Sequence, residues 1–199
     1  MTIIRSVDDL KAIYGSGSEA SNLKVTPFLT PEYRRMIEAA PFVALATVGP
    51  EGADCSPRGD KGGVVRVEDE RTILLPDWRG NNRVDSLINI VRDPRVALMF
   101  LVPGSTTTMR INGKAVVSIA PELLQSFEMD GKHPRTVIVI TVDEVYFQCA
   151  RALMRSELWN PDNFVDPASL PTPGAMLKAA KQDFDKDTYD REWPARAVS

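Results

Sequence analysis

The connections between the apolar segments of this chain are too short to hold crossover helices. Residues 42–48 (FVALATV) have no polar face, and the turn 49–52 (GPEG) leads directly into the extended segment 53–57. A connection this short forces antiparallel pairing. Residues 95–102 (RVALMFLV) are again apolar on both faces. Antiparallel strands of this kind suit a closed or nearly closed barrel whose outer face is partly covered by helices or by a partner subunit.

The remaining pattern predicts a mainly β protein with flanking helices, folded as a small Greek-key barrel. The expected strands are 42–48, 53–57, 64–67, 72–75, 95–102, 107–119, 135–142 and 145–149. The expected helices are 5–14, 30–39, 82–92, 121–129 and 150–158. Asn112-Gly113 predicts a bend or bulge within its strand. Because so few helices cannot cover the barrel, we expect a dimer.

The length of 199 residues suits one domain over 1–199. Its expected parts are an N-terminal helix and linker (1–29), a barrel core (30–160) and a C-terminal tail (161–199), the last rich in proline and then in charge.

Composition excludes several functional classes. A net charge of -3 is not that of a protein that wraps nucleic acid non-specifically. No apolar run approaches a membrane span, and the acidic N-terminal residues do not resemble a signal peptide. Cys55 and Cys149 have no metal-ligand or CxxC spacing, which favours a reduced, cytoplasmic chain. His133 is the single histidine, so a histidine-rich metal site is excluded.

Residues 72–92 (TILLPDWRGNNRVDSLINIVR) predict a strand, a turn and a helix in immediate succession. Asn81 or Asn82 can cap the helix, whose apolar positions are 84, 87, 88 and 91. Free backbone N–H groups and two amide side chains at the helix start, with the guanidiniums of Arg79 and Arg83, form the chemistry of an anion site, and phosphate is the natural candidate. The alternative is a capped connection with solvated arginines, and Asp85 can itself satisfy the helix dipole.

Three further groups of polar residues are candidates for binding. Ser56 and Arg58, on either side of Pro57, can grip a phosphate, although Arg58 also fits a solvated turn. Arg110 and Asn112 share one face of a strand, where they either face a planar ring or form a polar outer surface. The last set is spaced by four and is either a pocket wall or an exposed basic stripe: Arg151, Arg155 and Trp159.

Four segments together carry a family resemblance: SPRGD, ILLPDWRGNNRVDSLINIVRDPRVALMF, RINGKAVV and YFQCARALMRSELWNP. They resemble the pyridoxamine 5′-phosphate oxidase-related FMN-binding split-barrel family over roughly residues 30–160. The likeness is greatest to the branch of FMN-dependent enzymes with no assigned activity.

The resemblance implies a six-stranded antiparallel Greek-key split barrel and a homodimer with FMN at its interface. By position, it implies that Arg58, Asn82 and Arg83 hold the FMN phosphate, with Ser56 helping. It places Arg110 near the isoalloxazine ring. The segment that completes the site, at the barrel rim or from the other subunit, contains Arg151, Arg155 and Trp159.

The expected function is therefore that of an FMN-dependent oxidoreductase acting on a small molecule, with NAD(P)H as a candidate electron donor. The chain ends DREWPARAVS and lacks the tryptophan and arginine–histidine tail motif of authentic pyridoxamine phosphate oxidases, which argues against that reaction. No general acid or base stands out. The alternatives are a non-catalytic flavin-binding or redox-sensing module, a split barrel that binds haem or a deazaflavin, and an interaction protein with this fold.

Overall fold

The computed structural model describes residues 3–197, with side chains through residue 194. Residues 1, 2, 198 and 199, which the predicted segments 1–29 and 161–199 include, lie outside the described residues. The chain falls into two compact units, one ending at Leu153 and the other starting at Met154. Whether the chain acts as one domain over 1–199 stays a prediction.

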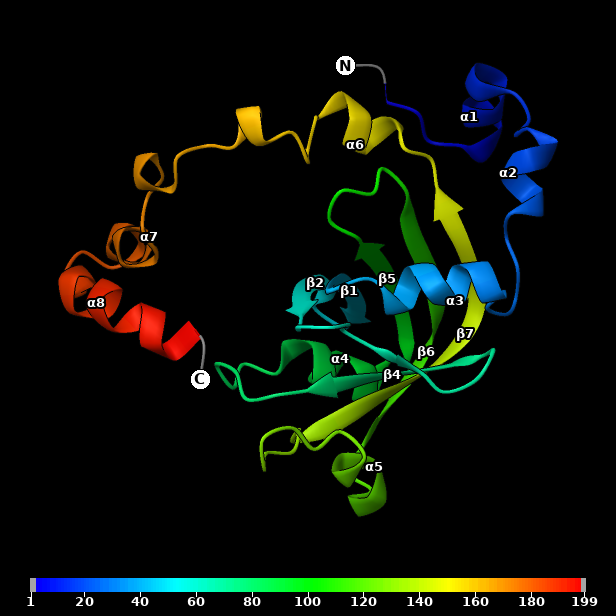
Figure 1. The fold of residues 1–199 in the computed structure, drawn as a ribbon. Helices are drawn as coiled ribbons and strands as arrows, with labels where there is room; N and C mark the ends of the chain where they lie inside the picture. Colours follow the sequence, from blue (N-terminus) through cyan, green and yellow to red (C-terminus); the bar gives the residue numbers. More distant parts are fainter. Residues whose placement is uncertain (1–2, 198–199) are drawn as a thin grey trace. The chain divides into compact units, whose positions relative to one another are not determined.

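A single antiparallel sheet organises the first unit (Figure 1). Its spatial order is β2-β1-β5-β6-β7-β4-β3. The strands are β1 (Phe42–Gly49), β2 (Gly52–Gly59), β3 (Arg66–Val67), β4 (Thr72–Asp77), β5 (Arg95–Leu101), β6 (Thr108–Ser118) and β7 (Thr136–Gln148). Every neighbouring pair is antiparallel, as the short connections predict.

The prediction of a six-stranded barrel is wrong in its strand count and in its closure. In the described residues seven strands pair, and β2 and β3 remain at the edges of the sheet. The sheet nevertheless curls. This is seen from Arg58 near the end of β2, whose Nη2 lies 3.5 Å from Oδ1 of Asp77 at the end of β4. Strands β2 and β4 are thus joined through side chains and not through a strand ladder.

The predicted bulge at Asn112-Gly113 is confirmed, and it explains a second correction. The segments 135–142 and 145–149 are one strand, β7, because Asp143 is an extra residue opposite the register shift between Asn112 and Gly113. A Cβ at Gly113 would collide with the carbonyl oxygen of Thr141, so this close approach of the two backbones needs glycine.

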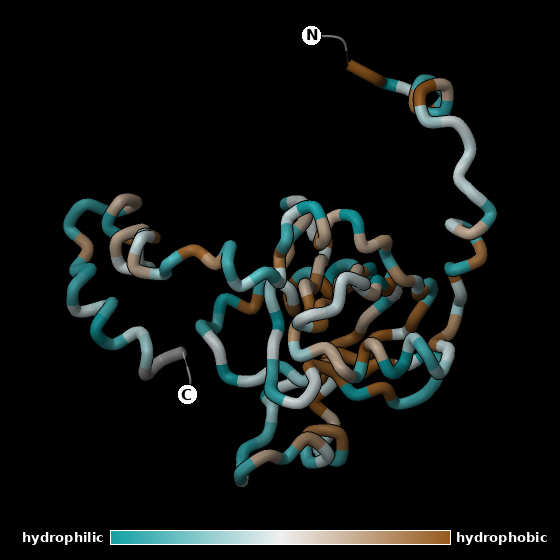
Figure 2. Tube along the Cα trace, turned by 45° about the horizontal axis from the view of Figure 1, so that its top comes forward, coloured by the Kyte–Doolittle hydropathy of each residue, from teal (hydrophilic) through white to brown (hydrophobic). Residues whose placement is uncertain are grey.

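The core lies on the inner face of the curled sheet, where the apolar strand residues meet (Figure 2). Its largest fully buried side chains include Phe100, Leu45 and Ile140. Helix α3 adds Ile37, which is fully buried. Burial of these side chains is the main stabilising contribution to the sheet.

A helix is present at each of the five predicted places, with shifted bounds, and the described residues form three further α-helices, one within residues 1–29 and two within residues 161–199. The helices are α1 (Val7–Tyr14), α2 (Glu19–Leu23), α3 (Pro31–Glu38), α4 (Asp85–Arg92), α5 (Pro121–Gln125), α6 (Arg151–Arg155), α7 (Pro173–Ala180) and α8 (Lys186–Ala197), with the short 3-10 turns η1 (Pro161–Asn163) and η2 (Pro167–Ser169). The predicted start at Thr30 is confirmed, since its hydroxyl accepts a hydrogen bond from the Tyr33 backbone N–H at 3.2 Å. Residues 15–21 are not purely a linker, because Ser18 caps α2.

The second unit is built on two helices, α7 and α8, that pack on each other. The carboxylate of Asp190 accepts a hydrogen bond of 2.7 Å from the Gly174 backbone N–H and ties the start of α7 to α8. Tyr189 and Trp193 stack with ring centroids 5.7 Å apart. In the described part of the chain, no helix is both long and apolar enough to cross a bilayer.

Candidate functional site

A cavity of about 190 Å³ lies where the ends of β2 and β4 meet the loop before α4. Arg58 comes from β2 and Asp77 from the last position of β4. Arg135 and Thr136 enter from the start of β7. The remaining lining residues are Trp78, Gly80, Asn81, Asn82, Val84, Asp85 and Leu87. The cavity therefore gathers charged and amide groups from segments that are distant in the sequence.

Strand β2 presents alternate residues to this side of the sheet. Asp54, Ser56 and Arg58 are partly buried, whereas Cys55 and Pro57 are exposed. This is the period of two that an extended strand imposes. The side chain of Arg58 is 27% exposed, and its guanidinium forms the 3.5 Å ion pair with Asp77, which is 15% exposed.

Several buried polar atoms of residues that line this cavity have no hydrogen-bond partner among the described residues. In the described part of the chain, four buried side-chain polar atoms lack a hydrogen-bond partner. Three of them belong to residues that line this cavity: Arg58 Nε, Trp78 Nε1 and Thr136 Oγ1. A buried donor without a partner costs about 1–3 kcal/mol, so native proteins rarely leave such groups unsatisfied. Two N–H donors and a hydroxyl around a site with two arginines suit an oxyanion.

Arg135 is a cavity residue for which sequence reasoning had no signal. Its guanidinium donates a 2.7 Å hydrogen bond to Oδ1 of Asn82. The pairing of Asp77 with Thr136 between β4 and β7 brings it into place. No spacing rule joins residue 135 to residue 58 or 82, because the register of strands far apart in the sequence decides their proximity.

Asp77 is the cavity residue whose pKa is shifted. Burial raises the pKa of Asp77 above its ordinary value, while attraction to Arg58 and Arg135 opposes that rise. The ion pair with Arg58 would by itself lower the pKa, so the net direction means that desolvation outweighs the pairing.

The loop before α4 differs from its predicted form. Asn81 and Asn82 do not cap the helix, because Val84 occupies the N-cap position in a left-handed conformation (φ 50°) without a side-chain cap. Asn81 instead accepts a hydrogen bond of 3.1 Å from the Arg83 backbone N–H. Arg83 is 78% exposed and pairs with Asp85 at 2.8 Å. Its side chain lines a separate cavity of about 360 Å³, so the guanidiniums of Arg83 and Arg58 do not share one cavity.

Ser56 lies next to the cavity and does not line it. Its hydroxyl donates to Oδ2 of Asp54 at 3.2 Å, and the hydroxyl of buried Ser86 donates to the same oxygen at 3.0 Å. Asp54 thus joins β2 to the first turn of α4. The direct role of Ser56 in binding stays a prediction.

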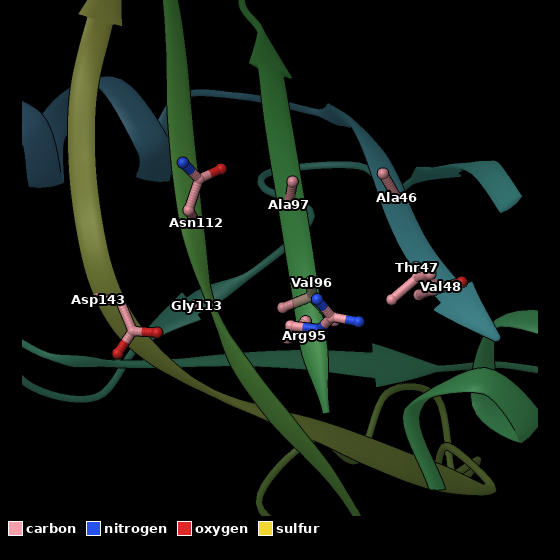
Figure 3. A pocket seen from close by; sticks show the side chains of 9 residues that line it. All are labelled: Ala46, Thr47, Val48, Arg95, Val96, Ala97, Asn112, Gly113 and Asp143. Atoms are coloured by element: carbon pink, nitrogen blue, oxygen red, sulfur yellow. The ribbon is translucent and has the colours of Figure 1, made fainter. Parts of the chain in front are cut away.

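Arg110 lies on a different part of the sheet, facing outward between Met99 and Tyr146. Its guanidinium carbon is 5.2 Å from the centre of the Tyr146 ring. Beside it is a trough of about 450 Å³, with Ala46 and Ala97 at its base and Asn112 and Asp143 on neighbouring strands (Figure 3). Arg110 and Asn112 share this outer face, as predicted, and their binding role is untested.

The predicted set of Arg151, Arg155 and Trp159 is divided between the two units. Arg151 belongs to the first unit, and Arg155 and Trp159 belong to the second. Helix α6 ends at Arg155, so Trp159 lies in the turn beyond it and the predicted shared helical face is wrong for that residue. His133 is in a loop after α5, 3.8 Å from a carboxylate oxygen of Glu128.

Comparisons with known proteins agree with the sequence resemblance. Residues 29–149 match the family described as pyridoxamine 5′-phosphate oxidase. No curated protein matches the chain.

Similar solved structures include a Lactobacillus delbrueckii protein named as a candidate pyridoxamine 5′-phosphate oxidase, with 22% identity, 61% of this chain and 95% of that chain covered, and a TM-score of 0.49. HupZ of Group A Streptococcus has 20% identity, coverage of 61% and 94%, and a TM-score of 0.47. General stress protein 26 of Bacillus anthracis has 16% identity, coverage of 57% and 88%, and a TM-score of 0.43. The family match spans more than half of the chain, and the chain belongs to the pyridoxamine 5′-phosphate oxidase family.

Proposed function

We propose that the chain is an FMN-dependent oxidoreductase that acts on a small molecule and holds the FMN phosphate in the cavity between Arg58 and Arg135. The observation that carries this proposal is the set of three buried, unpartnered polar atoms on the lining residues Arg58, Trp78 and Thr136. Membership of the family supports it, as does the curled sheet with unpaired edge strands, which suits a split barrel.

The size of the cavity is consistent with a phosphate group and not with a whole flavin. A volume of about 190 Å³ is below the range of roughly 300–1,000 Å³ typical of sites that enclose a small organic ligand. A second cavity of about 200 Å³ adjoins it, because both are lined by Arg58, Asp77, Trp78 and Gly80. We propose that the phosphate and the attached polyol chain occupy these two adjoining cavities and that the ring lies outside them.

The outer face of the sheet is the proposed surface for the ring and for a second subunit. Bound FMN supplies the hydride or electron transfer. Arg110 would contribute positive charge to an electron-rich ring, and covering the trough would exclude water. The small apolar residues Ala46 and Ala97, with Met99 at 41% exposure, favour a second copy of this chain as the cover. The proposed state is a homodimer.

An Arg58→Ala variant tests the phosphate site. Removing the guanidinium should weaken FMN binding by about 1.5–3 kcal/mol, as for a lost charged hydrogen bond. Riboflavin, which lacks the phosphate, should bind both proteins equally. Titration of the flavin-free protein with each ligand measures both affinities.

The matched control is Arg71→Ala, which removes an exposed arginine in the turn between β3 and β4. It should bind FMN like the unchanged protein. Equal FMN affinity in the Arg58 variant and the control would refute the phosphate site.

A non-catalytic flavin-binding or redox-sensing module is the second candidate, since both carboxylates that line the cavity, Asp77 and Asp85, are paired with arginines. Anaerobic addition of NAD(P)H to the FMN-loaded protein separates the two. Bleaching of the flavin absorbance that reverses with an added acceptor supports an oxidoreductase, and unchanged absorbance with a range of donors favours the module.

A further inference from the structure

Asp77 already pairs with one nitrogen of the guanidinium that an incoming anion would need, while Nε of the same Arg58 has no partner among the described residues. Oδ1 of Asp77 is 3.5 Å from Nη2 of Arg58, and the Asp77 side chain is largely buried. A phosphate bound to Arg58 would therefore lie within a few ångströms of a carboxylate. Like charges at this separation in a partly buried site repel each other appreciably.

The other carboxylate that lines the cavity is differently placed. Asp85 is paired with Arg83 at 2.8 Å, and Arg83 does not line this cavity. A ligand can therefore bind without breaking the Asp85 pair. Asp77, by contrast, pairs with Arg58 itself, so ligand and carboxylate compete for one guanidinium.

The backbone holds Asp77 at the cavity. Its carbonyl oxygen accepts a hydrogen bond of 3.0 Å from the Arg135 N–H, and the residue is the last pair of the β4–β7 ladder, opposite Thr136. The main chain of Asp77 is therefore held beside Arg135 and Thr136, and its carboxylate interacts with the charges of Arg58 and Arg135. Burial leaves the charge of this carboxylate poorly solvated, which raises the pKa of Asp77 even without a bound anion.

We infer that Asp77 is an internal competitor of the phosphate group, pairing with Arg58 until the ligand's phosphate takes that guanidinium, and that this residue sets the affinity of the site for phosphate-bearing ligands. This inference rests on the phosphate cavity of the proposed function. Asp77 is thus a specificity-determining residue, because its charge acts on the phosphate and not on the rest of the ligand.

The test is an Asp77→Asn variant, which removes the charge and keeps the size of the side chain. It should bind FMN and inorganic phosphate at least about tenfold more tightly, because removing Asp77 removes the repulsion between its negative charge and the phosphate. Riboflavin affinity should stay the same. The control is Asp8→Asn, which removes an exposed charge on α1, outside the cavity. Calorimetric titration of flavin-free protein gives all the affinities.

Tighter binding of FMN and phosphate by the Asp77 variant alone supports the inference. Equal or weaker FMN binding by that variant overturns it, and so does an equal gain for riboflavin, which would indicate a general structural change. If the Asp77→Asn variant fails to fold, Asp77→Ser, which also removes the charge, replaces it. The same ligands are titrated, and the same two outcomes support or overturn the inference. FMN affinity that is insensitive to Arg58→Ala would instead refute the proposed phosphate cavity itself.

Discussion

At the scale of single residues, the site is a balance between buried donors and one buried acceptor. Arg58 and Trp78 each keep a buried N–H without a partner, and Asp77 supplies the opposing charge. Such an arrangement is unfavourable for folding and favourable for ligand binding, because a ligand can complete hydrogen bonds that the protein leaves open. Functional sites commonly carry this kind of perturbed charge.

The raised pKa of Asp77 predicts how stability depends on pH. Above the ordinary carboxyl pKa, the unfolded chain releases this proton more readily than the folded chain does, so ionisation of Asp77 lowers the free energy of unfolding as pH rises. In the absence of ligand, Asp77→Asn should therefore unfold at a higher temperature than the unchanged protein at neutral pH. Thermal unfolding of both proteins from pH 4 to pH 7.5 measures the difference.

The difference between the two melting temperatures should shrink as the pH falls, because Asp77 in the unchanged protein then gains a proton and loses its unfavourable charge. Taking the difference cancels the other carboxylates, which titrate in both proteins. A variant that is less stable at neutral pH would show that the ion pair with Arg58 outweighs the burial of the carboxylate.

At the scale of elements, α4 shows how a sequence pattern can indicate the helix but not its buried face. The apolar positions 84, 87, 88 and 91 predict the face that packs on the sheet, yet Val91 is 77% exposed. The buried residues are Ser86 and Ile90. The hydroxyl of Ser86 donates a hydrogen bond to Asp54, and the amide of Asn89 donates a hydrogen bond of 3.1 Å to the hydroxyl of Thr47. These two polar contacts fit the observed rotation of the helix.

Two isoleucines on α4 test this orientation. Ile90 is 3% exposed and Ile88 is 40% exposed. Ile90→Ala should lower the free energy of unfolding by about 2–5 kcal/mol, as for a large-to-small change in a core. Ile88→Ala should have a clearly smaller effect, because much of that side chain is already in contact with solvent. Urea unfolding of both variants gives the comparison, and a larger loss for Ile88 would restore the predicted face.

At the scale of the whole molecule, the outer surface of the sheet is the proposed interface of the homodimer. Met99 is 41% exposed on the outward side of β5, beside Arg110 on β6. If a second copy covers this surface, Met99→Glu should separate the dimer into monomers while the fold is kept, because a charge would be buried at the interface. Light scattering after size-exclusion chromatography measures the mass.

The control for this prediction is Met129→Glu, which places the same charge on a methionine that is 50% exposed after α5. It should leave the mass unchanged. A Met99 variant that stays dimeric would move the interface elsewhere on the molecule, and a monomeric unchanged protein would refute the homodimer.

The amino-acid sequence by itself determined the order of the elements, the antiparallel pairing and the bulge at Asn112-Gly113. These features are local, since short turns, caps and glycine act over a few residues. It also identified Arg58 and Asn82, which line the cavity. The family resemblance, carried by four segments in order, agrees with the match over residues 29–149.

Only the tertiary structure decided which groups share the cavity. Arg135 and Thr136 reach Arg58 because β7 pairs with β4 and the sheet curls, and neither event leaves a signal in local spacing. The same holds for Asp143, which lies between the predicted strands 135–142 and 145–149 but which the bulge accommodates within β7. Contacts between distant segments depend on strand register and on which face each helix buries, and these follow from the packing of the whole core.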